Sequence, residues 1–225
     1  MSVLLYLETS SKNCSVGISK EGTLLAHEEL SEASFSHAEK LHPFIQSVLE
    51  KTSLNLQDIE GIVVGKGPGS YTGLRIGVAA AKGLCLALDL PLLSVGSLEI
   101  LAQNINNEES SYTIPLIDAR RMEVYTAVFN EAGQHVKEPW AEILEATSFS
   151  NYLEEKPCYF VGDGQEKFQK LLSHPNAKFD LDINEPSIQQ MIALATARFK
   201  AAKFEDLAYF EPFYLKEFYT TLPKS

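Results

Sequence analysis

The order of the predicted secondary-structure elements in the first half of the chain restricts the possible folds more than any other feature. Three strand-like segments come first, and a helix, a strand, a second helix and a further strand follow. Because a parallel strand needs a long crossover connection, usually a helix, this order predicts a mixed sheet with helices on its faces. The expected strands cover residues 3–8, 14–19, 23–30, 62–64 and 92–95, and the expected helices cover 36–51 and 72–88. Glu21-Gly22 is the expected turn between the second and third strands, and Ser36 is the expected N-cap of the first helix.

The second half of the chain shows the same order in a weaker form. After a polar run at residues 104–111, two strand patterns precede a third, and short helix and strand patterns then alternate up to a long helix at 187–203. The order in the first half matches the ribonuclease H-like half-domain, and the second half is a weaker repetition of it. We therefore expect two domains, residues 1–105 and 106–225, with the polar run at their boundary. The tail at 209–216 is expected to pack back on the body of the protein.

Charge and cysteine content narrow the classes of function. The chain has 19 basic and 30 acidic residues, a net charge of −11, and its longest basic cluster is Arg120-Arg121. A protein that binds nucleic acid directly normally carries a basic surface, so we expect any contact with nucleic acid to be indirect, although many cytosolic proteins are acidic. The isolated cysteines, the short apolar start of the chain and the lack of a long apolar run predict a cytoplasmic protein without zinc and without a membrane segment.

A glycine-rich loop, residues 65–70, lies between a predicted strand and a predicted helix. Such a loop can present backbone N–H groups and the positive end of a helix to a phosphate. Its spacing fits neither the Rossmann nor the P-loop pattern, and Thr72 stands where a nucleophile elbow needs glycine. Three interpretations stay open: a tight turn that allows close backbone approach, a phosphate site, and a nucleophilic Ser70. The candidate phosphate-binding residues are Thr9, Ser10, Gly67, Gly69 and Ser70.

The predicted helix after this loop contains an unusual number of small residues, among them Gly73, Gly77 and Gly83. Each glycine inside a helix costs about 1 kcal/mol relative to alanine. Close approach of another backbone is the usual compensation, and that backbone can belong to this chain or to another polypeptide. Both alternatives remain open at this point.

The sequence shows no assembled metal site and no catalytic acid–base pair. His37 and His42 are five residues apart, which places them about 140° apart around a helix, so they cannot share a metal ion. Glu8, Asp118 and Asp163 each follow a predicted strand, a position that often carries chemistry. We therefore predict no metal ligand and no catalytic residue in this chain.

Several motifs together resemble the TsaB family, the dimerisation subunits of the bacterial complex that forms threonylcarbamoyladenosine in tRNA. The resemblance is close over residues 1–125 and thin over 130–205. The motifs are Glu8-Thr9-Ser10, Ser36-His37-Ala38, the run GKGPGSYTGLRIG from Gly65 to Gly77, Gly83-Leu84, Val95-Gly96-Ser97-Leu98-Glu99, Ile117-Asp118-Ala119-Arg120, Glu123-Val124-Tyr125 and Glu211-Pro212-Phe213-Tyr214-Leu215.

This resemblance implies an α/β chain with the actin-like ATPase (ribonuclease H-like) fold, in which two similar lobes each hold a mixed sheet flanked by helices. It implies a non-catalytic subunit needed to place threonylcarbamoyl on adenosine in tRNAs that read codons beginning with A. The implied partners are the catalytic paralogue TsaD, the ATPase TsaE and, for the chain alone, a second copy. ATP and a metal ion are expected on those partners and no cofactor on this chain.

The resemblance and the small-residue helix together suggest a partner-binding face on the helices at 36–51 and 72–88. The predicted interface residues are His37, Leu41, Ile45, Tyr71, Arg75, Gly77, Val78, Ala80, Ala81 and Leu84. His37 stands where the catalytic paralogue has a pair of histidines. Glu8 departs from the aspartate usual in this family, and no glycine follows it to hold a phosphate, which makes ATP hydrolysis by this chain unexpected.

Two other functions stay possible. An actin-like small-molecule kinase or ATPase would need a phosphate-binding glycine near Thr9 and an acidic base. A serine peptidase built on Ser70 would need a histidine close to that hydroxyl.

Overall fold

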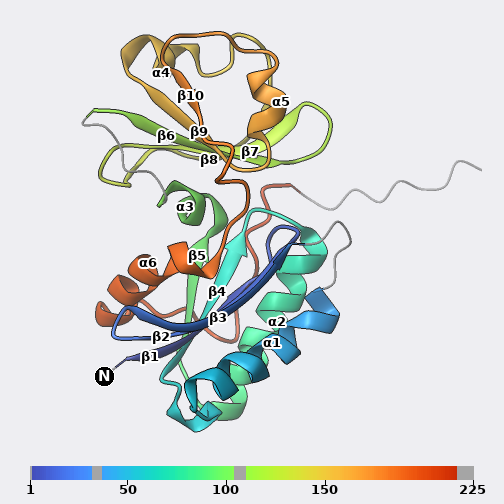
Figure 1. The fold of residues 1–225 in the computed structure, drawn as a ribbon, viewed down its shortest axis with the longest axis vertical. Coiled ribbons are helices and arrows are strands. Elements are labelled where there is room, and N and C mark those ends of the chain that lie inside the picture. Colours follow the sequence, from blue (N-terminus) through green and yellow to red (C-terminus); the bar gives the residue numbers. More distant parts are fainter. Residues whose placement is uncertain (1, 32–36, 104–109, 217–225) are drawn as a thin grey trace, which may run out of the picture.

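The computed structural model describes residues 2–31, 37–103 and 110–216, and it shows two stacked α/β lobes (Figure 1). Ser36, the predicted cap of the first helix, and most of the polar run at the expected domain boundary lie outside the described residues.

Lobe 1 is built on a five-stranded sheet with the order β3-β2-β1-β4-β5. The first three strands are antiparallel, and the turn predicted at Glu21-Gly22 joins β2 to β3. Strand β4 pairs in parallel with β1, and β5 pairs in parallel with β4. A helix connects each of these strands to the preceding strand in the chain, as the order of elements in the sequence predicts. The elements are β1 (Val3–Glu8), β2 (Asn13–Lys20), β3 (Thr23–Ser31), α1 (His37–Thr52), η1 (Leu56–Asp58), β4 (Gly61–Gly67), α2 (Tyr71–Leu88) and β5 (Leu92–Gly96).

The central strand β1 is buried on both faces of this sheet. Leu5 and Leu7 point into the core under α1 and α2, whereas Leu4 and Tyr6 point into the core on the opposite face. This division follows from the two-residue period of a strand. It explains why β1 is a continuous apolar run rather than an alternating one.

Lobe 2 repeats the topology of lobe 1. Its sheet has the order β8-β7-β6-β9-β10, so β6 takes the central place of β1 and β9 the place of β4. The repetition predicted from element order is therefore confirmed, and the fold is the actin-like, ribonuclease H-like one. The elements are β6 (Tyr112–Asp118), β7 (Glu123–Phe129), β8 (His135–Ile143), α4 (Ser150–Glu155), β9 (Cys158–Val161), α5 (Gln165–Gln169) and β10 (Ala177–Phe179).

The lobes exchange helices. Helix α3 (Ser97–Ala102) follows the last strand of lobe 1, yet its Leu98 and Leu101 share a core with the sheet of lobe 2. Helix α6 (Ile188–Lys200) follows the last strand of lobe 2 and packs on the sheet of lobe 1, opposite α1 and α2 (Figure 1). A domain border after residue 105 stays a prediction, and the C-terminal part of the chain contributes to both lobes.

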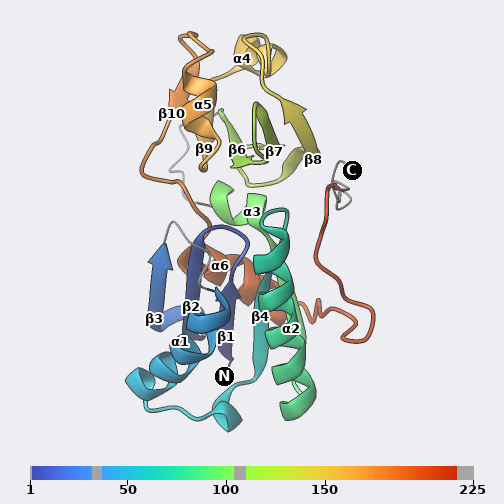
Figure 2. The same cartoon turned by 90° about the vertical axis from the view of Figure 1, so that its right-hand side faces the viewer.

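The last described segment, residues 204–216, returns along lobe 1 and rises toward lobe 2 (Figure 2). We call this segment the C-terminal strap. Its backbone is tied to lobe 1 by hydrogen bonds from Glu205 N to Leu92 O (2.8 Å) and from Phe213 N to Lys66 O (2.7 Å). These contacts confirm the expectation that the tail packs back on the body of the protein.

Candidate functional site

The glycine loop packs tightly against the turn that follows β1. A Cβ atom at Gly69 would lie 2.2 Å from Ser10 O, and one at Gly73 would lie 2.1 Å from Thr9 O. Ser70 N donates to Ser10 O (2.6 Å), and Thr9 Oγ1 donates to Gly73 O (2.8 Å). Of the three interpretations of this loop, the tight turn with close backbone approach describes what the structure shows.

The same contacts place the residues predicted to bind phosphate. Thr9 and Ser10 are buried, and the Thr9 hydroxyl and the Ser10 carbonyl already form hydrogen bonds within the chain. Gly67 has a positive φ of 99°, and its Cβ position lies against Leu74 and the strap. Ser70 is the N-cap of α2, where its Oγ accepts a hydrogen bond from Gly73 N (3.3 Å). Phosphate binding by this set stays a prediction.

Glu8 fills the space beneath the glycine loop. Its side chain is fully buried, with Oε1 accepting from Ser10 N (2.6 Å) and Oε2 without a hydrogen-bond partner among the described residues. The Cβ position of Gly65 lies 1.9 Å from Oε2, so any larger residue there would collide with the carboxyl group. Burial raises the pKa of Glu8 to about 7, because desolvation disfavours the charged form.

Helix α2 presents two different faces. One face packs inside lobe 1, and Gly77 belongs to it, because its Cβ position lies 2.2 Å from Thr9 Oγ1. The opposite face is exposed, and at Gly83 no atom of the described residues outside the adjoining helix backbone lies within 4 Å of the Cβ position. Of the two alternatives for the small residues, the segment that approaches Gly73 and Gly77 belongs to this chain, since Thr9 covers them, and the prediction of Gly77 as an interface residue is corrected. The exposed residues of α2 are Thr72, Arg75, Ala79, Gly83, Leu86 and Ala87.

The predicted interface residues divide accordingly. Tyr71, Ala80 and Leu84 are half-buried and Arg75 is exposed, so these four reach the surface. The buried members are His37, Leu41, Ile45, Gly77, Val78 and Ala81. They lie beneath the exposed residues of α1 and α2. Sequence reasoning did not select Phe44, Ala79, Gly83 and Leu86, which reach the surface of the same two helices.

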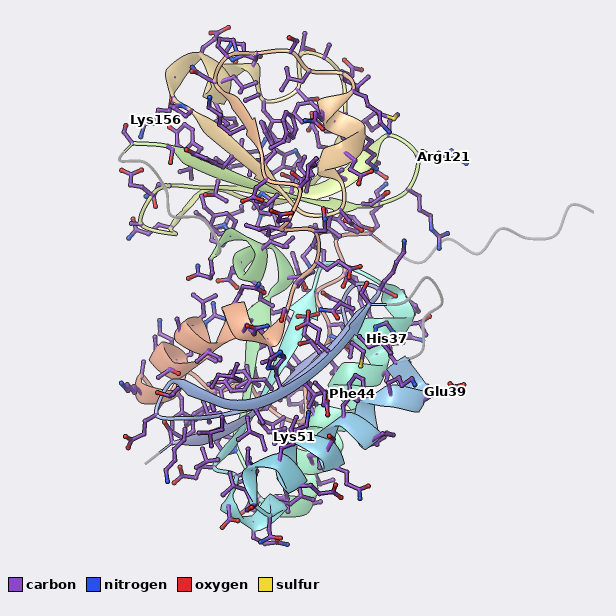
Figure 3. All side chains as sticks on the ribbon, in the orientation of Figure 1. His37, Glu39, Phe44, Lys51, Arg121 and Lys156 are labelled. Carbon is purple, nitrogen blue, oxygen red and sulfur yellow. The ribbon has the colours of Figure 1, made fainter. Side chains whose placement is uncertain are left out.

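Helix α1 lies beside α2 on the same face of the sheet (Figures 1 and 3). Figure 3 marks His37, Glu39 and Phe44 along α1. His37 is buried, with Nε2 3.3 Å from Asn13 O, whereas Phe44 is half-buried on the flank of the core. In the described part of the chain no group of three or more His, Cys, Asp or Glu side chains could hold a metal ion.

A cavity of about 340 Å³ lies between the lobes. Its walls come from the glycine loop, the ends of β6 and β9, and the strap. Asp118 and Asp163 meet there, with Asp118 N donating to Asp163 Oδ1 (2.8 Å), and Lys167 Nζ pairs with Asp118 Oδ1 (2.9 Å). Burial raises the pKa of Asp163 to about 6. The structure therefore brings together two of the three acidic candidates, while Glu8 lies buried in lobe 1.

By length and composition α2 is long and apolar enough to cross a membrane. It carries Arg75 and Lys82, and its buried face packs on β4 and β1. These contacts are those of a core helix in a globular lobe.

Comparison with known proteins gives consistent results. The family model for TsaD, tRNA N6-adenosine threonylcarbamoyltransferase, matches residues 25–221. The tRNA threonylcarbamoyladenosine biosynthesis protein TsaB of Escherichia coli K12 is 29% identical over 95% of this chain and 94% of its own length. TsaB of Buchnera aphidicola subsp. Baizongia pistaciae is 30% identical over 96% of this chain and 99% of its own.

Among solved structures, the crystal structure of an uncharacterized Pseudomonas aeruginosa protein "with similarity to peptidase YEAZ" superposes with a TM-score of 0.83 at 27% identity. It covers 96% of this chain and all of its own. YeaZ from the same organism gives a TM-score of 0.77 at 26% identity with the same coverage.

Proposed function

This chain belongs to the TsaB family, within the group that the TsaD model describes, and we propose that it acts as a non-catalytic partner subunit in the formation of threonylcarbamoyladenosine in tRNA. In this proposal it binds a TsaD-like catalytic paralogue and, with it, a TsaE-like ATPase, in the cytoplasm. Alone, the chain pairs with a second copy through the same face.

The exposed face of α2 carries this proposal. Ala79 and Gly83 leave the backbone of α2 open to close approach by another helix, and Leu86 is 79% exposed next to them. A glycine at position 83 costs helix stability, and none of the residues that the structure describes takes up the space that it leaves. A partner helix laid along α1 and α2 would use that space and cover the apolar side chains.

The turn after β1 supports a role without catalysis. Thr9 and Ser10 use hydroxyl and backbone groups to hold the glycine loop, and Glu8 fills the space beneath it. In the described part of the chain Ser70 has no hydrogen bond to a histidine, and its hydroxyl caps α2. We therefore propose that neither phosphate transfer nor peptide hydrolysis takes place on this chain, and that ATP and metal ions bind to the partners.

The charge of the chain supports indirect contact with tRNA. A net charge of −11 would repel a polyanion, so the partner would supply most phosphate contacts.

A bulky side chain on the exposed face of α2 tests the proposal. Gly83→Phe and Ala79→Phe should abolish co-purification with the TsaD-like partner, because the ring would hold the two helices apart. Both variants should keep the thermal unfolding of the parent chain. Glu154→Phe, an exposed position on α4 in lobe 2, is the matched control. Unchanged co-purification by both α2 variants would refute the placement of the interface.

A second measurement tests the function itself. Formation of threonylcarbamoyladenosine by the other purified subunits should depend on adding this chain. The Gly83→Phe variant should fail to restore it, whereas Glu154→Phe should restore it in full.

A further inference from the structure

The C-terminal strap reaches the N-terminal end of α2 through a stack of side chains. The ring of Tyr214 packs on the ring of Tyr71 with 5.0 Å between centroids, and the Arg75 guanidinium lies 4.1 Å from the centre of the Tyr71 ring. Tyr71 and Tyr214 are half-buried, and Arg75 is exposed. The stack therefore begins in the strap and ends at the rim of the α2 face.

The strap is held at several points on either side of this stack. On lobe 1, Lys82 Nζ donates to Phe210 O (2.9 Å), and Phe213 N donates to Lys66 O (2.7 Å). On lobe 2, Lys216 pairs with Glu123. Tyr214 thus lies in a segment whose backbone is tied to lobe 1 and whose Lys216 side chain is paired with lobe 2, so the start of the Tyr214 side chain is held near Tyr71.

An exposed arginine side chain loses considerable rotamer freedom when a partner immobilises it. Stacking on Tyr71 removes part of that freedom in the free chain, and Tyr214 in turn contacts the Tyr71 ring. Tyr209 offers an internal comparison, because it belongs to the same strap yet is 84% exposed.

We propose that Tyr214 is a positioning residue for partner binding. It holds Tyr71, and through Tyr71 the guanidinium of Arg75, in the orientation that the partner meets at the end of α2. This inference rests on the proposed function of the α1–α2 face. It adds a residue of the strap to those that determine partner binding at that face.

The experiment measures the Kd for the purified TsaD-like paralogue by isothermal titration calorimetry. Tyr214→Ala should weaken binding by roughly three- to tenfold, the range expected for one aromatic or cation–π contact. Tyr214→Phe should bind as the parent chain does, because it keeps the ring, and Tyr209→Ala should also leave binding unchanged. In an Arg75→Ala background, Tyr214→Ala should have no further effect, which a merely structural role would not predict.

A readout in the free chain keeps this test separate from the proposed function. The NMR order parameter of the Arg75 Nε–H group should fall in Tyr214→Ala and stay unchanged in Tyr214→Phe. If the parent chain does not bind the paralogue, the proposed function fails while this measurement still reports on the stack. Binding by Tyr214→Ala equal to the parent, an effect that adds fully to that of Arg75→Ala, or an unchanged order parameter would each overturn the inference.

Discussion

Lobe 1 and lobe 2 have the same strand order but differ in the helices that cover their sheets. In lobe 1, α1 and α2 contain 16 and 18 residues, whereas α4 and α5 of lobe 2 contain 6 and 5. Short helices are enough to close a hydrophobic core. In lobe 2 they do so together with a group of phenylalanines packed around Phe160. The additional turns in lobe 1 extend an exposed face, which supports the proposal that lobe 1 binds the partner.

The lobes also differ at the ends of their central strands. Glu8 ends β1 and is fully buried, whereas Asp118 ends β6 at the equivalent place and is exposed to the cavity between the lobes. In lobe 1 the carboxyl group fills a space inside the lobe, and in lobe 2 it pairs with Lys167. The three predictions below test these differences, from the largest expected effect to the smallest.

The buried carboxyl group of Glu8 should make stability depend on pH. Its pKa is about 7 in the folded chain against an ordinary value of 4.5, so between these values the folded state binds the proton that the unfolded state has lost. Stability from this group is therefore complete below pH 4.5 and is lost as pH rises toward 7, by up to about 3 kcal/mol. Urea unfolding at several pH values measures it.

Glu8→Gln should remove this part of the pH dependence, so that the difference between the variant and the parent grows with pH. Asp163, whose pKa is about 6, contributes in the same direction and stays present in both chains. Glu39→Gln, an exposed position on α1, is the control. Parallel pH profiles for the parent and Glu8→Gln would contradict the prediction.

Alanine at two glycines of α2 should give effects of opposite sign. Gly73→Ala places a Cβ against Thr9 O and should destabilise the chain by about 1–3 kcal/mol. Gly83→Ala meets no atom and should stabilise it by about 1 kcal/mol, because alanine favours the helix. Urea unfolding measures the change in the free energy of unfolding for each variant. Equal effects would mean that the two faces of α2 do not differ in the way described.

The β2–β3 turn of lobe 1 and the β6–β7 turn of lobe 2 should both favour glycine, although only the turn of lobe 1 has one. Arg120 and Arg121 have φ values of 73° and 53° between β6 and β7, a region that costs non-glycine residues energy. Arg121→Gly should therefore raise stability by about 1 kcal/mol. Gly22→Ala, at the β2–β3 turn where φ is 80°, should lower it by a similar amount. A loss of stability in Arg121→Gly would contradict the strain argument.

Much of the fold could be predicted because it depends on local patterns. The antiparallel start of the chain, the turn at Glu21-Gly22 and the crossover helices all follow from periodicity and turn residues. The destination of α6 could not be predicted, because its apolar stripe fits either sheet. Contacts across the chain, such as Ile188 N with Ser15 Oγ (3.2 Å), place it on lobe 1.

The sequence predicted which helices form the candidate site, but it did not predict which face of α2 is exposed. Helical spacing placed Gly73 and Gly77 on one side of α2. Whether that side points inward depends on Thr9, which lies more than sixty residues earlier in the chain. The sequence held one signal for the exposed face. The spacing of Gly83 from Gly73 and Gly77 places it on a different side of the helix.

The exchange of α3 and α6 has a consequence for how the chain is made. A ribosome releases the strands of lobe 1 first, but most of the cover of their second apolar face comes from α6, at residues 188–200. Lobe 2, in turn, packs against α3, a helix synthesised before any of its own strands. We expect neither half to mature separately on the ribosome, and both to close only when translation of the chain is nearly complete.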